Sequence, residues 1–186
     1  MRLRKINEHL YYLKNEAYYD RPNLFYIKGD NYSVAIDAGN SKKHVDKFYK
    51  ELKKNNLPLP EYTIISHWHW DHTFGLKYIH GKSIGSIKTY EKLNEVAKWK
   101  WTRKDMDERQ ANGEDIEMCN TCIAREYKDL SKIEVVNVDE YIEDKKVLDL
   151  GNLKIELIPH MSTHSDDALF VYIEGEGIIC AGCRLD

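Results

Sequence analysis

One short run, HWHWDH beginning at His67, constrains this chain more than any other feature, because it packs three histidines and an aspartate into six residues. The residues before it, 62–66, are rich in apolar side chains and are predicted to form a buried strand. Side chains of an extended segment alternate between its two sides, so His67 and His69 point the same way and can hold one cation. Asp71 and His72 follow about one turn later, so they can face the same cavity from the start of the next helix.

Histidine and aspartate at this spacing indicate metal binding. Neutral imidazole suits Zn²⁺, and a carboxylate adds a harder oxygen ligand that suits a second ion. The competing interpretation is an aromatic-rich loop with buried core histidines, which explains one histidine well. Four coordinating groups in six residues favour a ligand cluster instead. Trp68 and Trp70 alternate with the histidines and are predicted to pack the other side of the loop.

The rest of the pattern predicts a mixed α/β (α+β) fold with antiparallel hairpins. A helix capped by Asn40 or Ser41 follows from apolar residues at i, i+3, i+4 and i+7 starting at Val45. A second, short helix is predicted over 73–79. The predicted strands are 10–13, 24–27, 32–37, 62–66, 83–87, 133–138, 146–150, 153–158, 168–173 and 177–181.

Length and spacing predict a single domain over residues 1–186, with a polar helical excursion at about 90–128. A chain of 186 residues can bury enough surface for one core without disulfides. The excursion mixes acidic and basic residues almost evenly, which is typical of a solvated segment outside the central sheet. Trp99 and Trp101 lie in it; they could cover a substrate groove, but a core contact is the favoured interpretation.

The charge balance argues against two classes of partner. Lys and Arg total 28 and Asp and Glu 31, a net charge of −3, whereas nucleic-acid and anionic-membrane binders carry a basic excess. The apolar runs are too short to cross a bilayer, and the first residues lack the apolar core of a signal peptide. We therefore expect a cytoplasmic protein without a membrane partner and with nucleic acid disfavoured.

Four cysteines form two Cys-x-x-Cys pairs, Cys119/Cys122 and Cys180/Cys183. The gap between the pairs far exceeds the usual spacing of about 15–20 residues in zinc ribbons, so a joint zinc site is disfavoured. Cys119 and Cys122 could be a redox pair or half of a metal site, but two ordinary cysteines one turn apart on a helix is the favoured interpretation. For Cys180, packing as a small buried hydrophobe is favoured.

The motif at 67–72 resembles the His-x-His-x-Asp-His signature of the metallo-β-lactamase superfamily. Asp37-Ala38-Gly39 is similar to the Asp-x-Gly turn before that family's first helix, and His164 with the three residues after it resembles its third-histidine motif. Gly182-Cys183 stands where relatives carry Gly-Asp or, in one lactamase subclass, Gly-Cys. The resemblance runs from about residue 10 to the end of the chain. It implies an αββα sandwich whose loops meet at a two-metal cleft.

This resemblance also implies a ligand set. One zinc would be held by His67, His69 and His164, with an open position for the water that such a metal activates. His160, four residues before His164, is interpreted as a strand-end residue near the site and not as a ligand.

A second ion would take Asp71 and His72, with Cys183 as a possible further ligand, and Asp71 could also orient the attacking hydroxide as a catalytic residue. The family's last histidine ligand, closing strand and helix normally follow this position, whereas the chain ends at Asp186. We therefore expect a sandwich that lacks its last strand and helix. Either the chain is a truncated form of the family's domain, or its second metal site is weak, empty or completed by another chain, for example in a homodimer.

We therefore expect a metallo-hydrolase that uses a zinc-activated water on a small ester, thioester, lactone or amide. The expected cofactor is one or two Zn²⁺ ions, with iron or manganese as alternatives; His69 favours zinc over iron, since the iron-binding relatives carry glutamate there. Hydrolysis of β-lactams is disfavoured, because the Gly-Cys lactamases carry a lysine where this chain has Asp186. The alternatives are a phosphodiesterase or RNA-processing hydrolase of the same fold, and a degenerate non-catalytic module for metal binding or oligomerisation.

Overall fold

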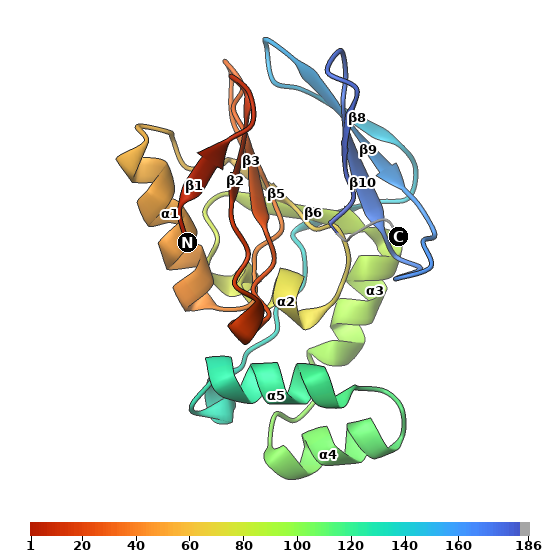
Figure 1. Ribbon diagram of the computed structural model, residues 1–186. Coiled ribbons are helices and arrows are strands. Elements are labelled where there is room, and N and C mark those ends of the chain that lie inside the picture. The colour runs from red at the N-terminus through yellow and green to blue at the C-terminus, as the bar shows by residue number, and fades with distance from the viewer. Residues whose placement is uncertain (183–186) are drawn as a thin grey trace.

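The computed structural model describes residues 1–182, and it forms two β-sheets packed face to face (Figure 1). Within the described residues the first sheet has its strands in chain order: β1 (Leu3–Lys5), β2 (Leu10–Leu13), β3 (Leu24–Ile27), β4 (Val34–Ile36), β5 (Tyr62–Ile64), β6 (Lys82–Ser86) and β7 (Glu140–Ile142). The second sheet consists of β8 (Lys146–Asp149), β9 (Lys154–Pro159), β10 (Leu169–Ile173) and β11 (Ile178–Cys180).

The helices connect the strands of the first sheet or lie beneath it in Figure 1. They are α1 (Lys42–Lys54), α2 (Trp70–Thr73), α3 (Ile87–Val96), α4 (Arg103–Ala111) and α5 (Glu117–Glu126), with short 3-10 turns η1 (Ala17–Tyr19), η2 (Leu76–Tyr78) and η3 (Leu130–Lys132). The hydroxyl of Ser41 caps α1 by accepting from the His44 amide, which confirms one of the two predicted caps.

Strand direction explains where the histidine motif lies. β1 to β4 are paired antiparallel, whereas β4, β5, β6 and β7 are paired in parallel, with helical crossovers between them. Parallel neighbours bring their carboxyl ends to one edge of the sheet, where connecting loops meet. The motif follows β5 and therefore leaves the sheet at this edge.

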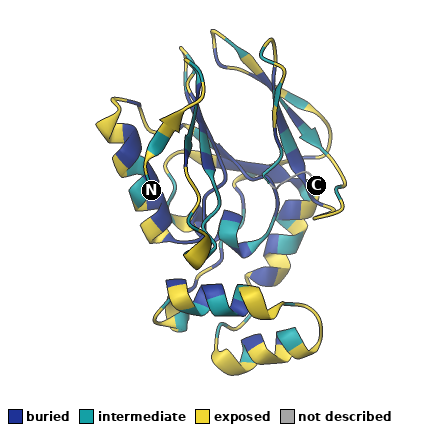
Figure 2. Ribbon diagram, viewed as in Figure 1, coloured by how far each residue is buried: buried dark blue, intermediate teal, exposed yellow. Residues whose placement is uncertain are grey.

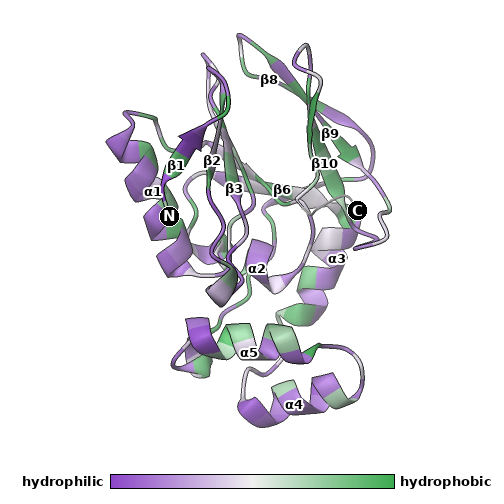
Figure 3. Cartoon of the chain, viewed as in Figure 1, coloured by the Kyte–Doolittle hydropathy of each residue, from purple (hydrophilic) through white to green (hydrophobic). Residues whose placement is uncertain are grey.

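Apolar side chains from both sheets fill the space between them. The facing strands of the two sheets are largely buried in Figure 2 and largely hydrophobic in Figure 3, and in β10 buried residues alternate with half-buried ones. The first sheet contributes Val34, Ile36, Ile64 and Ile84, and the second contributes Ile155, Leu157, Leu169, Val171 and Cys180. A second layer of contacts joins the outer face of the first sheet to α1 through Tyr26, Ala35, Phe48 and Leu52.

The fold is therefore the predicted sandwich of two sheets with helices on the first sheet. In residues 1–182 no helix packs on the outer face of the second sheet, which agrees with the expected lack of the closing helix (Figure 1). The same residues contain no helix that is both long and apolar enough to cross a membrane.

Helices α4 and α5 form a hairpin below the sandwich in Figure 1, and one buried carboxylate attaches it. Glu126, at the end of α5, accepts two hydrogen bonds of 2.8 Å from Arg21 and one of 2.5 Å from the Ser41 hydroxyl. Both Glu126 and Ser41 are buried, so this charge-assisted contact holds the hairpin against the start of α1.

Two predicted elements differ from the structure. The predicted strand 133–138 is absent, and β7 lies further along the chain. The apolar residues Ile133, Val135 and Val138 are buried, but they pack against the α3 side of the core without a strand partner. A short run of apolar residues indicates that a segment is buried. Packing against a helix can bury such a segment as well as pairing in a sheet can. The helix predicted over 73–79 starts earlier, as α2, and resumes as η2.

His44 generates a prediction on stability. Its side chain is buried in α1, neither ring nitrogen makes a hydrogen bond within residues 1–182, and burial lowers the pKa of His44 from 6.5 to about 3. The unfolded chain therefore binds a proton between these values that the folded chain does not, so acid favours unfolding. His44 should cost about 2 kcal/mol of stability between pH 7 and pH 5.

Urea unfolding of the metal-free protein at the two pH values measures this loss. The variant His44→Gln, which cannot titrate there, should show a pH-dependent loss smaller by that amount. An unchanged pH dependence in the variant would show that His44 binds its proton normally in the folded state.

Candidate metal centre

Three histidines from two loops bring ring nitrogens to one point. His67 and His69 lie between β5 and α2, and His164 lies in the loop between β9 and β10. His69 Nδ1 lies 3.1 Å from His67 Nε2 and 3.0 Å from His164 Nε2. All three ligand atoms are within 4.8 Å of one another, and they make the only such group of His, Cys, Asp or Glu in residues 1–182.

The chemistry of these nitrogens fits a cation better than hydrogen bonding. A neutral imidazole nitrogen carries either one N–H or one lone pair, so Nδ1 of His69 can pair with only one of the two nitrogens that face it. A central metal ion would accept all three lone pairs. With Zn–N bonds of about 2.0–2.1 Å, tetrahedral ligands stand about 3.3–3.4 Å apart, close to the two spacings observed.

A hydrogen-bond network behind His67 fixes which nitrogen is available. Ser66 Oγ donates to Asp37 Oδ2 over 3.0 Å, so its lone pairs can accept from His67 Nδ1, which also lies 3.0 Å away. With the proton on Nδ1, the lone pair is on Nε2, toward the other two histidines. This is how carboxylates and hydroxyls behind a metal-binding histidine orient it.

Asp71 and His72 form a neighbouring pair at the start of α2. Nε2 of His72 lies 3.0 Å from Asp71 Oδ2, and Nδ1 lies 2.7 Å from Asp37 Oδ2. Burial lowers the pKa of His72, but the two carboxylates raise it well above its ordinary value. Burial raises the pKa of Asp71, but His72 outweighs this and holds it below its usual range. No third ligand atom joins this pair in the described part of the chain.

Two histidines of the cluster, His67 and His69, are neutral near pH 7. Burial lowers the pKa of His67 strongly, and the neighbouring His72, His69 and His164 lower it further. For His69 burial lowers the pKa to about 4, with Asp71 opposing the shift and His164 adding to it. Neutral imidazole is the form that binds metal ions, so these pKa shifts prepare the cluster for a cation.

Asp167 follows His164 in the third-histidine motif, but its structural role in this site could not be predicted from the sequence. It is buried, and its carboxylate accepts from the Trp68 amide at 2.8 Å, from Thr89 Oγ1 at 2.7 Å and from the Ser165 hydroxyl. It thereby joins the histidine motif to the loop of His164. Its place in that motif did not distinguish its role from that of the neighbouring Asp166.

The other candidates lie elsewhere. His160 is exposed after β9, its ring packs on Phe170 at 4.8 Å, and it is not part of the cluster. Cys119 and Cys122 lie on α5 as free thiols, and Cys180 is a free thiol buried between the sheets. Cys183 lies outside the described residues.

A cavity of about 360 Å³ opens beside the cluster. His69, Asp71, His72 and His164 line one part of it. The tryptophans that the sequence placed in the excursion line another part, so Trp99 and Trp101 contact both the cavity and the α3–α5 core. A larger, open depression along the end of α1, lined by Tyr49 and Leu57, contains none of the candidate ligands.

Comparison with known proteins gives a consistent match. The family model for the metallo-beta-lactamase superfamily matches residues 18–183. No curated protein sequence matches the chain. The native FEZ-1 metallo-beta-lactamase of Legionella gormanii is similar in structure, with a TM-score of 0.64 and 14% identity over 98% of this chain and 64% of that one.

Two further solved structures resemble the chain. BJP-1, a subclass B3 metallo-beta-lactamase of Bradyrhizobium japonicum, has a TM-score of 0.63 and 14% identity over 93% of this chain and 56% of that one. A metallo-beta-lactamase of Cronobacter sakazakii with a HARLDQ motif has a TM-score of 0.62 and 15% identity, over 96% and 62%. The chain thus spans less than two thirds of each relative, and likeness at this identity shows the fold alone.

Asp37 provides a test of the network. The substitution Asp37→Asn keeps the size of the side chain. Asparagine also tolerates the left-handed backbone conformation of this position, where φ is 67°. It removes the charge that accepts from Ser66 and His72, which should lower the free energy of unfolding by about 1.5–3 kcal/mol in urea titrations.

Asp46→Asn is the matched control. Asp46 pairs with Lys42 at 2.7 Å on an exposed face of α1, where such a pair contributes about 0–1 kcal/mol. Equal losses of stability in the two variants would show that the buried network contributes no more than a surface ion pair.

Proposed function

This chain belongs to the metallo-beta-lactamase superfamily, and from that premise we propose that it is a metal-dependent hydrolase of a small ester, thioester, lactone or amide. One observation carries the proposal: nitrogens of His67, His69 and His164 converge within 4.8 Å beside a cavity large enough for a small substrate. Without a cation, three imidazoles in this arrangement would stabilise the fold little, because their ligand nitrogens face one another and cannot all be paired by hydrogen bonds.

The donor set fits zinc. His67, His69 and His164 would hold the ion, and Asp71 with His72 would be the ligands of a second one. A zinc ion bound by three histidines supplies hydroxide near neutral pH, because it lowers the pKa of water from 15.7 to about 7. Iron or manganese can bind nitrogen and carboxylate ligands too, but three nitrogens favour zinc.

The residues around the proposed ligands would orient the ligands and the attacking water. Ser66 and Asp37 hold His67 in the tautomer that leaves Nε2 unprotonated. Asp167 holds the two ligand loops together. The Asp71 carboxylate lines the cavity, where it can accept a hydrogen bond from a water molecule and orient it toward a substrate carbonyl.

The walls of the cavity favour carbonyl substrates over nucleic acids. No lysine or arginine in residues 1–182 lines it, whereas a phosphodiester would require basic groups to balance its charge. Its aromatic side chains instead suit an apolar group next to the reacting carbonyl. The phosphodiesterase alternative is therefore the weaker candidate.

His164 gives the sharpest test, because its side chain is exposed and its removal should leave the fold intact. We expect His164→Ala to weaken zinc binding by more than about 100-fold, since losing a ligand should exceed the 10–100-fold cost of losing an outer-shell partner. Hydrolysis of p-nitrophenyl acetate by the zinc-loaded protein should fall to the rate of the metal-free protein. Zinc affinity is measured by competition with a chelating dye.

His160→Ala is the matched control, four residues away and equally exposed. It should leave zinc affinity and hydrolysis unchanged. Tight zinc binding without hydrolysis of any ester, thioester, lactone or amide would favour the non-catalytic metal-binding module. Unchanged zinc affinity in His164→Ala would contradict the proposed ligand set.

A further inference from the structure

Two large apolar side chains are exposed where they line the cavity beside the histidine cluster. Ile116 and Met118, at the start of α5, are 57% and 52% exposed, and both line that cavity. No other large apolar side chain of residues 1–182 is exposed to this degree and lines it. Apolar surface left in water is unfavourable, and a patch of it beside a cavity is typical of a ligand-binding surface.

Ile116 also occupies a position at which a helix normally begins with a polar residue. The hydroxyls of Ser41, Ser86 and Thr102 cap α1, α3 and α4 by accepting a hydrogen bond from a backbone amide. The corresponding residue of α5 is Ile116, which makes no side-chain cap. Isoleucine is among the poorest residues at this position. Helix stability therefore does not account for this residue, whereas contact with an apolar ligand would.

A row of aromatic rings lines the inside of the cavity and ends at the histidine cluster. The ring centroid of Trp68 lies 4.8 Å from that of His69 and 6.3 Å from that of Trp99. Trp101 continues the row, with its centroid 5.9 Å from Trp99 and 4.9 Å from Phe74. All of these side chains line the cavity. An apolar group bound along the rings would therefore lie next to the proposed metal ligands.

The protein's own cations already pack on these rings. Nζ of Lys92 lies 5.2 Å from the ring centroid of Trp68 and 5.9 Å from that of Trp99. The guanidinium carbon of Arg109 lies 4.6 Å from the centroid of Trp99 and 4.7 Å from that of Trp101. Neither cation lines the cavity. The attraction of the rings for cations is therefore met within the protein, and the surface that they offer to the cavity is apolar.

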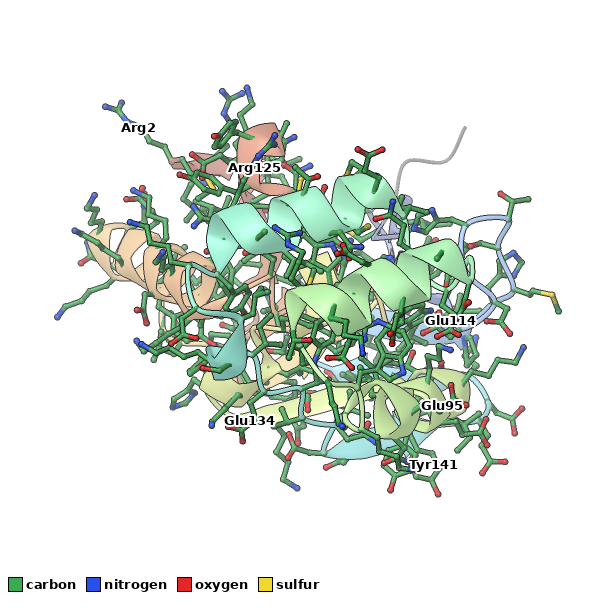
Figure 4. All side chains as sticks on the ribbon, turned by 90° about the horizontal axis from the view of Figure 1, so that it is seen from below. Arg2, Glu95, Glu114, Arg125, Glu134 and Tyr141 are labelled. Carbon is green, nitrogen blue, oxygen red and sulfur yellow. The ribbon has the colours of Figure 1, made fainter. Side chains whose placement is uncertain are left out.

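The charges around the cavity disfavour an anionic group on the bound chain. No lysine or arginine in residues 1–182 lines the cavity, whereas Asp20, Asp71, Glu114 and Asp115 do. Figure 4 shows Glu114 at the turn between α4 and α5, at the opposite end of the hairpin from Arg125. Two of the acids therefore lie just before α5 begins, close to its exposed apolar residues. A carboxylate or phosphate there would meet like charge, so an uncharged group fits best.

We propose that this cavity binds an uncharged aliphatic chain next to the reacting carbonyl, so that the proposed hydrolase prefers substrates with such a chain over their short analogues. The proposal rests on the proposed function and specifies its substrate. The chain would lie along Trp99 and Trp101, and Ile116 with Met118 would cover its far end. The cavity volume of about 360 Å³ is within the range of small-ligand pockets. The chain can belong to the acyl group or to the alcohol of an ester, and two substrate series distinguish these sources.

The p-nitrophenyl esters of acetate, butyrate and hexanoate lengthen the acyl group, and ethyl, butyl and hexyl acetate lengthen the alcohol. In at least one series, kcat/KM of the zinc-loaded protein should rise about two- to fourfold for each added methylene, because each one leaves water partly or wholly on binding. The series that shows the rise identifies the group that carries the chain. A flat or falling kcat/KM in both series would overturn the proposal.

A double variant locates the effect at the start of α5. Ile116→Ser with Met118→Gln removes the two exposed apolar side chains, while serine can cap the helix and glutamine favours it. The ratio of kcat/KM between the longest and the shortest ester should fall at least about fourfold. Ile179→Ser with Met161→Gln makes the same changes at exposed positions that do not line this cavity, and it should leave the ratio unchanged. A ratio that persists in the first variant would overturn the proposal.

Binding without turnover separates this proposal from the proposed function. Butan-1-ol and hexan-1-ol compete with the neutral fluorophore N-phenyl-1-naphthylamine for the zinc-loaded protein, and again after chelation. Hexan-1-ol should have a Kd about 4- to 16-fold lower in both states, and the Ile116→Ser, Met118→Gln variant should reduce this preference. Equal binding of the two alcohols would overturn the proposal.

The combined results assign each failure to one proposal. Tighter binding of the longer alcohol without hydrolysis of any ester would support the chain site and contradict the hydrolase. Equal hydrolysis along both ester series would contradict the chain site and leave the hydrolase in place.

Discussion

The carboxylate of Asp37 is the contact on which the rest of the site depends. It follows β4, and its two oxygens accept from the Ser66 amide and hydroxyl after β5 and from His72 in α2. Two parallel strands and the helix of the motif are therefore fixed by one buried anion. Groups held in this way need little reorganisation when a metal or substrate arrives, which is why the ligand nitrogens can stand close together beforehand.

Most of the fold could be predicted from the sequence, because its signals are local. Glycine-containing turns such as Gly151-Asn152 mark the hairpins of the second sheet, and the spacing from Val45 marks α1. The prediction failed at 133–138, where one-sided burial was read as strand pairing. The local pattern of apolar residues predicts which side chains are buried. A strand also needs a neighbouring strand with free backbone groups, and whether one is available depends on the fold of the whole chain.

The residues of the site also differ in how far the sequence alone predicts them. His67, His69, Asp71 and His72 are neighbours in sequence, and their spacing alone indicates a metal site. The contributions of Asp20, Trp99 and Glu114 to the cavity depend on how the α4–α5 hairpin packs on the sandwich. The ion pair of Glu126 with Arg21 and the buried side chains of the hairpin hold it there. Residues that act through tertiary placement carry no signal in spacing. The metal ligands are thus legible in the sequence, and the residues that would select a substrate are not.

X-ray absorption at the zinc edge tests the central claim most directly. If the imidazoles of His67, His69 and His164 bind one ion, the spectrum of the zinc-loaded protein should fit nitrogen neighbours at about 2.0–2.1 Å, with the outer-shell features of three histidine rings. In the His164→Ala variant one ring should be lost. A shell of sulfur neighbours at about 2.3 Å, or a spectrum with one imidazole or none, would show that zinc binds elsewhere and would contradict the account.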